Sequence, residues 1–389
     1  MTLTNYWWLL IWLFVGGGIL TILIPKQREL VEGKMEERWS SLAAFLLILP
    51  YIFWAGFRQD LWDTASYRQA FAECASSFGE INTYLTGITK DKGFYFLMAL
   101  VKSVFGNSDV IYFLVLAVFQ LFIIMWLCRK YSEDYWFSIF LFIASTDYIS
   151  WTWNGIRQFT AVVIIYAATP LIIKKKFIPS ILLILLASTM HQSALLMIPV
   201  IFIIQGKAWN KKTILCILAS LVVLMFVDQF TNIMDSLLAE TQYVNVVSDY
   251  QAWNDDGTNP LRVLVYSIPM ILSLVGLKYI RMEDDPVINF AVGASIIASG
   301  FYIISAATSG LFLGRLPIYV SAWSQYILLP WEINHMFTDR SVRIIKIVAV
   351  ICYCVFFFIT SEIGTAKHVY SIFSGSKFTC WGIYSINSP

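Results

Sequence analysis

Long apolar runs, separated by short polar breaks, follow one another along most of this chain. A helix that crosses the hydrocarbon layer of a membrane requires about 20 predominantly apolar residues. The sequence is 58% hydrophobic and only 13% charged, and its mean hydropathy is +0.69. These values exclude an ordinary soluble domain. We predict an all-α, polytopic integral membrane protein that forms a single transmembrane domain over residues 1–389.

The apolar runs predict about twelve membrane-spanning helices at the length that a bilayer requires. Their approximate ranges are 6–24, 41–57, 109–127, 135–150, 159–173, 178–190, 194–205, 213–230, 261–279, 286–306, 316–333 and 344–360. The first run has no basic start and no small-residue cleavage pattern, so we expect a retained helix rather than a signal peptide. The runs 178–190 and 194–205 are short, and they could form either one broken helix or a hairpin.

The positions of Lys and Arg predict the topology, because short basic loops mark the cytoplasmic side. Most of these residues fall in one alternating set of loops, provided that the chain turns back near His191. This pattern favours the hairpin and places both termini outside. Two larger extracytoplasmic loops follow, at about 58–108 and 229–260, and we expect both to contribute to the active site. The first contains an amphipathic or re-entrant piece from Gly93 to Phe105.

Three arginines, Arg58, Arg157 and Arg315, stand at the ends of apolar runs on the predicted outer face. A guanidinium at the hydrocarbon boundary is costly unless it reaches water, forms an ion pair or lines a wet cavity. Arginine matches the oxygens of phosphate groups in a bidentate manner. Several such cations on one face therefore indicate a site for an anionic ligand.

The first of these segments combines Arg58 with Asp60, Asp63 and Tyr67. Such a group could bind sugar hydroxyls or hold a cation. It could also be a solvated helix end in which Asp60 or Asp63 only pairs with Arg58, an interaction that contributes little at a surface.

The second segment reads Trp151-Thr152-Trp153-Asn154-Gly155-Ile156-Arg157-Gln158. The tryptophans alone are typical of an interfacial aromatic belt, and Asn-Gly is an ordinary turn signal. Asn154, Arg157 and Gln158 are less ordinary, because they supply many donors at the start of an apolar helix. A helix N-terminus adds a favourable field for an anion, so phosphate recognition is the natural hypothesis.

His191 occupies the predicted outer turn between two short helices. A lone histidine is more often a hydrogen-bonded turn residue than a catalyst, although it is the side chain best suited to proton transfer near neutral pH. Arg315 begins the eleventh helix and would otherwise be a snorkelling interfacial residue. No cluster of His, Cys and carboxylate has metal-ligand spacing, so we expect neither a metal nor another cofactor. Cys74 and Cys380 both lie outside, which leaves a disulfide between them open.

Four of these motifs, in this order, resemble the EpsG-type, Wzy-like bacterial polysaccharide polymerases. The similarity covers roughly residues 40–335. It includes Arg58, Asp60 and Tyr67; Asn154 with Arg157-Gln158; the Lys-rich turn 174–176 followed by His191 and Ser193; and Gly314-Arg315 with Tyr319. The chain departs from the family pattern at Gln59, where a small residue is expected. It also departs at Asp91-Lys92-Gly93-Phe94, where a Glu is expected shortly before Gly-Phe, and we assign no carboxylate role there.

The resemblance implies polymerisation of undecaprenyl-pyrophosphate-linked oligosaccharide units on the outer face of the bacterial plasma membrane, for O-antigen, capsule or exopolysaccharide. His191 or Asp60 would be the catalytic base. The pyrophosphate and the sugars would be bound by Arg58, Asp63, Tyr67, Asn154, Arg157, Gln158, Arg315 and Tyr319. The expected partners are these lipid-linked substrates and membrane lipid, with a chain-length regulator and a flippase as further candidates, and no nucleic acid.

Two alternatives from other classes remain open. A GT-C-like glycosyltransferase that uses a polyprenyl-phosphate sugar would depend mainly on Asp60 and Asp63. A flippase or other transporter of lipid-linked oligosaccharides would carry polar residues deep within its helices, because transporter sites lie near the membrane midplane. The polar residues singled out here gather instead at one rim, which favours an enzyme.

Overall fold

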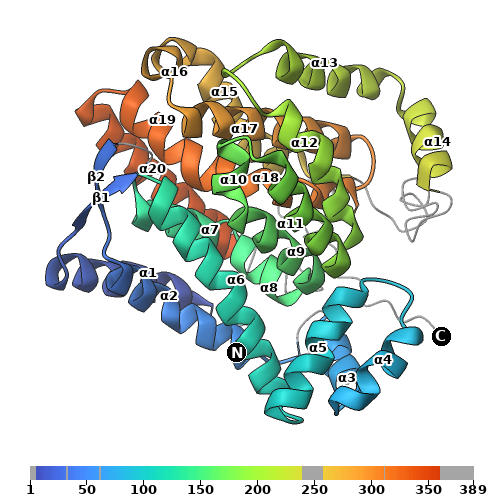
Figure 1. The fold of residues 1–389 in the computed structure, drawn as a ribbon. Helices are drawn as coiled ribbons and strands as arrows, with labels where there is room; N and C mark the ends of the chain where they lie inside the picture. Colours follow the sequence, from blue (N-terminus) through green and yellow to red (C-terminus); the bar gives the residue numbers. More distant parts are fainter. Residues whose placement is uncertain (1–5, 32–33, 61–62, 239–256, 311, 360–389) are drawn as a thin grey trace. The chain divides into compact units, whose positions relative to one another are not determined.

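The computed structural model describes residues 6–31, 34–60, 63–238, 257–310 and 312–359. These residues are almost entirely helical, which confirms the predicted all-α class (Figure 1). The chain divides into two compact units. The first runs through Ala167 and adds Leu183–Ala194 and the described residues from Arg343 onward. The second contains Ala168–Leu182 and Leu195–Val342.

Apolar helices of different lengths form the body of the first unit. They are α1 (Trp7–Leu23), α2 (Ser41–Gly56), α6 (Asp109–Tyr131), α7 (Tyr135–Ala144), α8 (Asp147–Trp153) and α9 (Ile156–Ala167). α2 and α9 both pack against α6. Two buried tyrosines satisfy their hydroxyl groups on backbone carbonyls: Tyr51 donates to Leu9 and Tyr148 donates to Tyr51, each at 2.6 Å. These two large aromatic side chains are thereby buried with their polar atoms bonded.

Three shorter helices occupy the predicted outer loop 58–108. They are α3 (Thr64–Glu73), α4 (Phe78–Thr86) and α5 (Lys92–Phe105), and α5 is the amphipathic piece expected from Gly93 to Phe105. Their apolar faces form a common core with the start of α6, which includes Phe71, Phe94 and Tyr112. The buried Lys102 of α5 donates to the carbonyls of Phe71, Ala72 and Cys74 at the end of α3. α3 and α5 are therefore held together by polar as well as apolar contacts.

The second unit is built around α17 (Pro286–Ala306), most of whose residues are buried. Around it lie α10 (Thr169–Ile173), α12 (Met197–Ile203), α13 (Lys211–Met225), α14 (Val227–Leu238), α15 (Pro260–Val275) and α16 (Leu277–Glu283). The run 316–333 is continuously helical, from α18 (Ile318–Ser321) through a π-helical segment η4 (Ala322–Leu328) to α19 (Leu329–Met336). A Cβ atom at Gly293 would lie 2.9 Å from the Ile204 carbonyl oxygen, so glycine permits this close helix approach.

Residues 178–205 form a hairpin rather than one broken helix. α11 (Phe177–Met190) is followed by the 3-10 turn η2 (Gln192–Leu196) and α12. The rings of Phe177 and Phe202 stack with their centroids 4.5 Å apart. Because 14 helical residues extend about 21 Å, these two residues can meet only if the chain reverses after α11.

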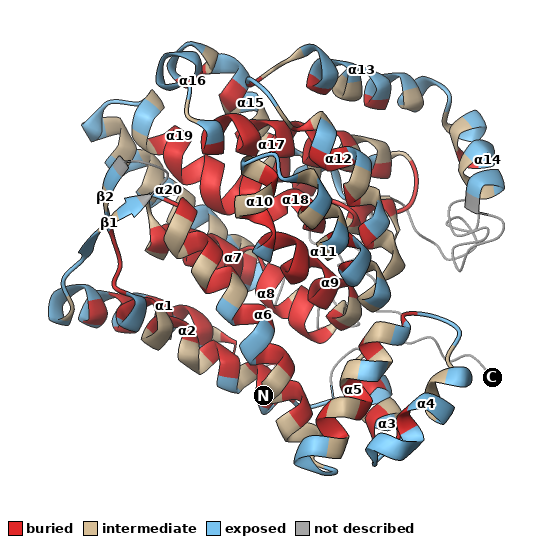
Figure 2. Ribbon diagram, in the orientation of Figure 1, coloured by how far each residue is buried: buried red, intermediate tan, exposed pale blue. Residues whose placement is uncertain are grey.

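The predicted count of about twelve spans is not confirmed when each span is required to have the usual length of a membrane-crossing helix. Three described helices are long and apolar enough to cross a membrane: α6, α17 and α20 (Asp339–Phe358). The count is up to five if each of two bent pairs is one span. The run 213–230 bends by 108° between α13 and α14, and the run 261–279 bends by 69° between α15 and α16. Several predicted spans correspond instead to shorter apolar helices, and α1 and α13 expose apolar residues, as lipid contact requires (Figure 2).

A two-stranded antiparallel hairpin, β1 (Gln27–Val31) and β2 (Lys34–Arg38), replaces the basic cytoplasmic loop expected between the first two helices. The side chain of Arg129 in α6 pairs with Glu29 and donates from Nε to the Trp39 carbonyl at 2.7 Å. These bonds hold the hairpin to the helices, because two strands alone are marginally stable.

Some predictions fall outside the described residues. They concern much of the loop 229–260, His368, and the Cys380 half of the candidate disulfide. Cys74 is buried, and its thiol donates to the Phe71 carbonyl at 3.2 Å.

Candidate functional site

Arg58 is buried beneath the outer helices of the first unit. The residue follows α2 and is 3% exposed. Its guanidinium donates to the carbonyls of Ala55 and Thr152. Its guanidinium carbon lies 4.6 Å from the ring centroid of Phe113 and 4.9 Å from that of Trp153. Its Nη2 group has no hydrogen-bond partner among the described residues. Arg58 therefore joins α2, α6 and α8 through backbone bonds and cation–π contacts, and its exposure to a ligand is small.

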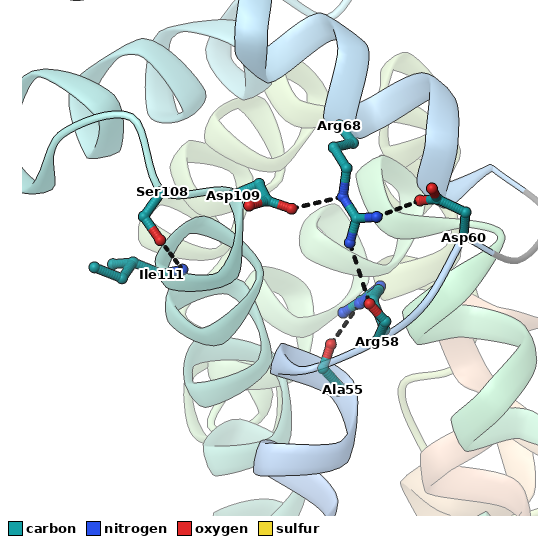
Figure 3. Close-up of polar contacts among 7 residues, drawn as sticks. All are labelled: Ala55, Arg58, Asp60, Arg68, Ser108, Asp109 and Ile111. Atoms are coloured by element: carbon teal, nitrogen blue, oxygen red, sulfur yellow. Dashed lines mark hydrogen bonds and ion pairs between the residues drawn. The ribbon is translucent and has the colours of Figure 1, made fainter. Parts of the chain in front are cut away.

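Arg68, to which the sequence analysis gave no role, takes the ion pair with Asp60 that one of the open alternatives assigned to Arg58 (Figure 3). Its Nη1 lies 2.5 Å from Oδ1 of Asp60, and its Nε lies 2.6 Å from Oδ2 of Asp109. Its Nη2 donates to the Arg58 carbonyl at 3.1 Å. The carboxylate of Asp60 is 54% exposed, so this arrangement is a surface ion-pair group of modest stability.

Arg157 lies in the first turn of α9 and makes two directed contacts. Its Nε donates to the hydroxyl of Tyr67 at 3.2 Å, and its Nη1 pairs with Oδ2 of Asp91 at 2.8 Å. A guanidinium has five N–H donors, and among the described residues no acceptor is bound by the Nη2 group or the second Nη1 hydrogen. The Arg157 side chain is 32% exposed. It is thus held at Nε and Nη1 and remains partly exposed.

Tyr67 comes from α3 and is almost fully buried, with its ring edge-on to Phe94. Burial raises the pKa of the Tyr67 phenol above its ordinary value, although the neighbouring Arg157 opposes the shift. The phenol is therefore protonated at neutral pH, and its oxygen accepts the Arg157 bond.

Asp91 is the functional candidate that the sequence analysis missed. Its side chain is only 2% exposed, and its second oxygen, Oδ1, accepts a bond from the backbone N–H of Gln192 at 3.3 Å. One carboxylate thus connects Arg157 of α9 to the turn that contains His191. A signal was present in the sequence, because the resemblance described above predicts a Glu shortly before Gly-Phe and Asp91 is an acidic residue two positions before Gly93.

His191 directly follows α11, and its Nδ1 lies 2.7 Å from Oγ of Ser193. Gly93 of α5 lies against this helix end, because a Cβ atom there would overlap Thr189 of α11. Close packing at Gly93 therefore brings α5 and the His191 turn together. Tyr67, Asp91, Arg157 and the His191 turn form one polar cluster from four separate segments.

The other predicted residues lie around or apart from this cluster. Asn154 ends α8, its N–H donating to the Ser150 carbonyl, and Gln158 is buried one position after Arg157. Asp63 precedes α3, and its carbonyl accepts the Tyr67 N–H. Arg315 and Tyr319 belong to the second unit, where Arg315 ends a 3-10 turn, η3 (Leu313–Arg315), and Tyr319 is buried in α18.

Comparison with sequence families matches residues 41–368 to the EpsG family. The match covers both units and includes every predicted site residue. No match is found among curated proteins or among solved structures.

Proposed function

Because the chain belongs to the EpsG family, which is associated with polysaccharide polymerisation in a general sense, we propose that it polymerises lipid-linked oligosaccharide units. In the proposed reaction, a hydroxyl oxygen of one unit forms a bond to the anomeric carbon of the growing glycan. The bond from that carbon to undecaprenyl pyrophosphate breaks, the pyrophosphate leaves with the electron pair, and a base takes the hydroxyl proton. The reaction takes place on the outer face of the bacterial plasma membrane.

The observation that carries this proposal is the partly exposed guanidinium of Arg157. Tyr67 holds Nε and Asp91 holds Nη1, and among the described residues the Nη2 group and one Nη1 hydrogen have no other acceptor. Pyrophosphate oxygens match such paired donors. As the sugar leaves, negative charge grows on the pyrophosphate, and a donor already held in place stabilises that charge without further reorganisation.

His191 is the better of the two proposed bases. Ser193 holds Nδ1 and thereby sets the orientation of the ring. Imidazole accepts protons near neutral pH, which suits transfer from a sugar hydroxyl. The carboxylate of Asp60 is already paired with Arg68 at 2.5 Å, so one of its oxygens is occupied.

The remaining residues enter the proposal through the family motif. Arg315, Tyr319, Asn154 and Gln158 would contact the pyrophosphate or the sugars. The same motif supports O-antigen, capsule or exopolysaccharide as the product class. A chain-length regulator and a flippase would act beside this protein.

The transport alternative has one specific observation in its favour. Glu332 in α19 is 0% exposed, and neither of its carboxylate oxygens has a hydrogen-bond partner among the described residues. An ionisable group inside a membrane helix is itself a reason to suspect function. It is the kind of buried polar residue that a transporter would use.

Deleting the gene and analysing the glycan separates the three functions. Loss of a polymerase should leave surface glycan of one complete repeat unit, and a plasmid copy should restore long chains. Loss of a flippase should leave complete units on the inner leaflet and none at the surface. Loss of a GT-C-like transferase should leave lipid-linked units that lack one sugar, which mass spectrometry would reveal. Either of the last two results would overturn the polymerase proposal.

A further inference from the structure

Asp91 has a local structure that its own helix does not explain. We propose that it is a positioning residue, which holds the Arg157 guanidinium and the His191 turn in one fixed arrangement for the reaction. This inference rests on the proposed polymerase function. It assigns a role to a residue outside the predicted site.

The first observation concerns helix capping. Asp91 is the N-cap residue of α5, a position where an Asp side chain usually accepts a bond from the first turn and stabilises the helix by about 1 kcal/mol. The Asp91 side chain makes no such bond. Six other polar N-cap residues of the described helices do: Ser40, Ser108, Asp134, Asn210, Asn259 and Asp285. Asp63, Ser77 and Thr146 also lack such a bond, so the role of Asp91 follows from what its side chain contacts instead.

The second observation concerns the backbone. Asp91 has φ 53° and ψ 41°, the left-handed conformation, which is unfavourable for residues other than glycine. Aspartate tolerates it better than most, but the surroundings must still select it. Backbone strain of this kind persists where other contacts require it and is concentrated at functional sites.

The third observation is what the side chain does instead. Oδ2 pairs with Nη1 of Arg157 at 2.8 Å, and Oδ1 accepts from the N–H of Gln192 at 3.3 Å. The carboxylate is therefore shared between the proposed pyrophosphate-binding residue and the turn that carries the proposed base. Each oxygen of Asp91 serves one of these two elements.

Burial makes this connection rigid. With a side chain that is 2% exposed, Asp91 has little water to replace a lost partner. Gly93, two residues later, lets α5 lie directly against Thr189 near the end of α11. The backbone packing and the carboxylate bonds thus fix the same junction between α5 and the His191 turn.

The test compares two substitutions that keep different properties of Asp91. Asp91→Asn keeps the shape but removes the charge, whereas Asp91→Glu keeps the charge on a longer arm. The assay follows glycan elongation in membrane vesicles on the cell's own lipid-linked units, normalised to protein amount. We expect Asp91→Asn to slow elongation by roughly 10- to 100-fold, within the range for losing a charge-assisted bond, and Asp91→Glu to retain more activity. Asp285→Asn is the matched control, because Asn caps a helix as well as Asp does.

A double-mutant cycle with Arg157→Ala separates positioning from an independent effect. If Asp91 acts through Arg157, the double variant should be no slower than Arg157→Ala alone. Guanidinium ion at low, non-denaturing concentration should partly restore Arg157→Ala, because Asp91 can hold the ion. It should not restore the double variant. The double variant contains no uncompensated buried charge, so it can be assayed even if Asp91→Asn alone accumulates poorly.

The outcomes separate this inference from the polymerase proposal. Normal elongation in Arg157→Ala would refute the proposed site itself. A slow Arg157→Ala with normal Asp91→Asn would overturn only the positioning role. Multiplicative losses, equal guanidinium rescue in both backgrounds, or Asp91→Asn more active than Asp91→Glu would also overturn it.

Discussion

Replacing Arg157 by lysine tests whether the planar guanidinium, and not only its positive charge, is required. A lysine ammonium could keep a charge near Asp91, but it cannot also reach Tyr67 and present a planar pair of donors to a ligand. We therefore expect Arg157→Lys to fold and to accumulate normally while elongation becomes slow. The structure makes this variant more informative than Arg157→Ala.

The expected size of the effect follows from the bonds that are lost. A hydrogen bond to a charged group contributes about 1.5–3 kcal/mol. If one such bond to the pyrophosphate acts only in the transition state, the rate falls roughly 10- to 150-fold. The partly exposed guanidinium of Arg157 offers more than one donor. The roughly 10- to 150-fold range is therefore a lower bound for the loss of all its bonds to the pyrophosphate.

Alanine at this position adds a separate effect on stability. It would leave the Asp91 carboxylate, with a 2% exposed side chain, without its cationic partner. Removing one member of a buried ion pair typically costs about 3–5 kcal/mol, and partial exposure of Arg157 should reduce that figure. Arg157→Ala should therefore accumulate less than Arg157→Lys.

The assay combines the surface glycan ladder on a gel with immunoblot quantification of the protein in membranes. We expect single repeat units to dominate in Arg157→Lys at wild-type protein abundance. Arg340→Lys, on the predicted cytoplasmic side, is the control and should give the normal ladder. A wild-type ladder from Arg157→Lys would refute the argument that the planar fork binds the pyrophosphate.

Three further predictions test packing, the base and sidedness. Gly93→Ala should lower the melting temperature of the purified protein, because overpacking against Thr189 costs about 1–3 kcal/mol; Gly79→Ala, with no atom within 4 Å, should not. Asp60→Asn should change elongation little, since its surface pair with Arg68 contributes about 0–1 kcal/mol, and a complete loss would favour the GT-C-like alternative. In a background without native cysteines, a cysteine at Glu80 should react with an impermeant thiol reagent from outside, and one at Lys211 should not. Labelling of the Lys211 position in intact cells would contradict the predicted topology.

Hydropathy predicted where helices occur much better than it predicted how far they continue. The run 286–306 coincides with α17, and the amphipathic piece from Gly93 to Phe105 is α5. The run 213–230 breaks at Phe226, an apolar residue that no average over the run can distinguish from its neighbours. Whether such a run is straight or bent is decided by tertiary packing, which a count of apolar residues does not contain.

The candidate site shows a similar division. Arg157 was predicted because its motif is local, with Asn154 and Gln158 beside it. Asp91 was missed because its two partners lie 66 and 101 residues away along the chain. From the local sequence alone, an aspartate before a helix would be interpreted as a helix cap. Only the fold shows that the Asp91 side chain contacts Arg157 and Gln192 instead.

Four cations of the first unit show why Arg157 is the best candidate for ligand binding. Arg58 is enclosed by aromatic rings, and Lys102 is used by three backbone carbonyls. Arg68 faces two carboxylates, Asp60 and Asp109, so its charge is more than balanced. Among the described residues Arg157 has one carboxylate partner, and its side chain is partly exposed. A pyrophosphate adds negative charge, and it would be repelled at Arg68 and excluded at Arg58, whereas at Arg157 it meets open donors that Asp91 and Tyr67 already hold in place.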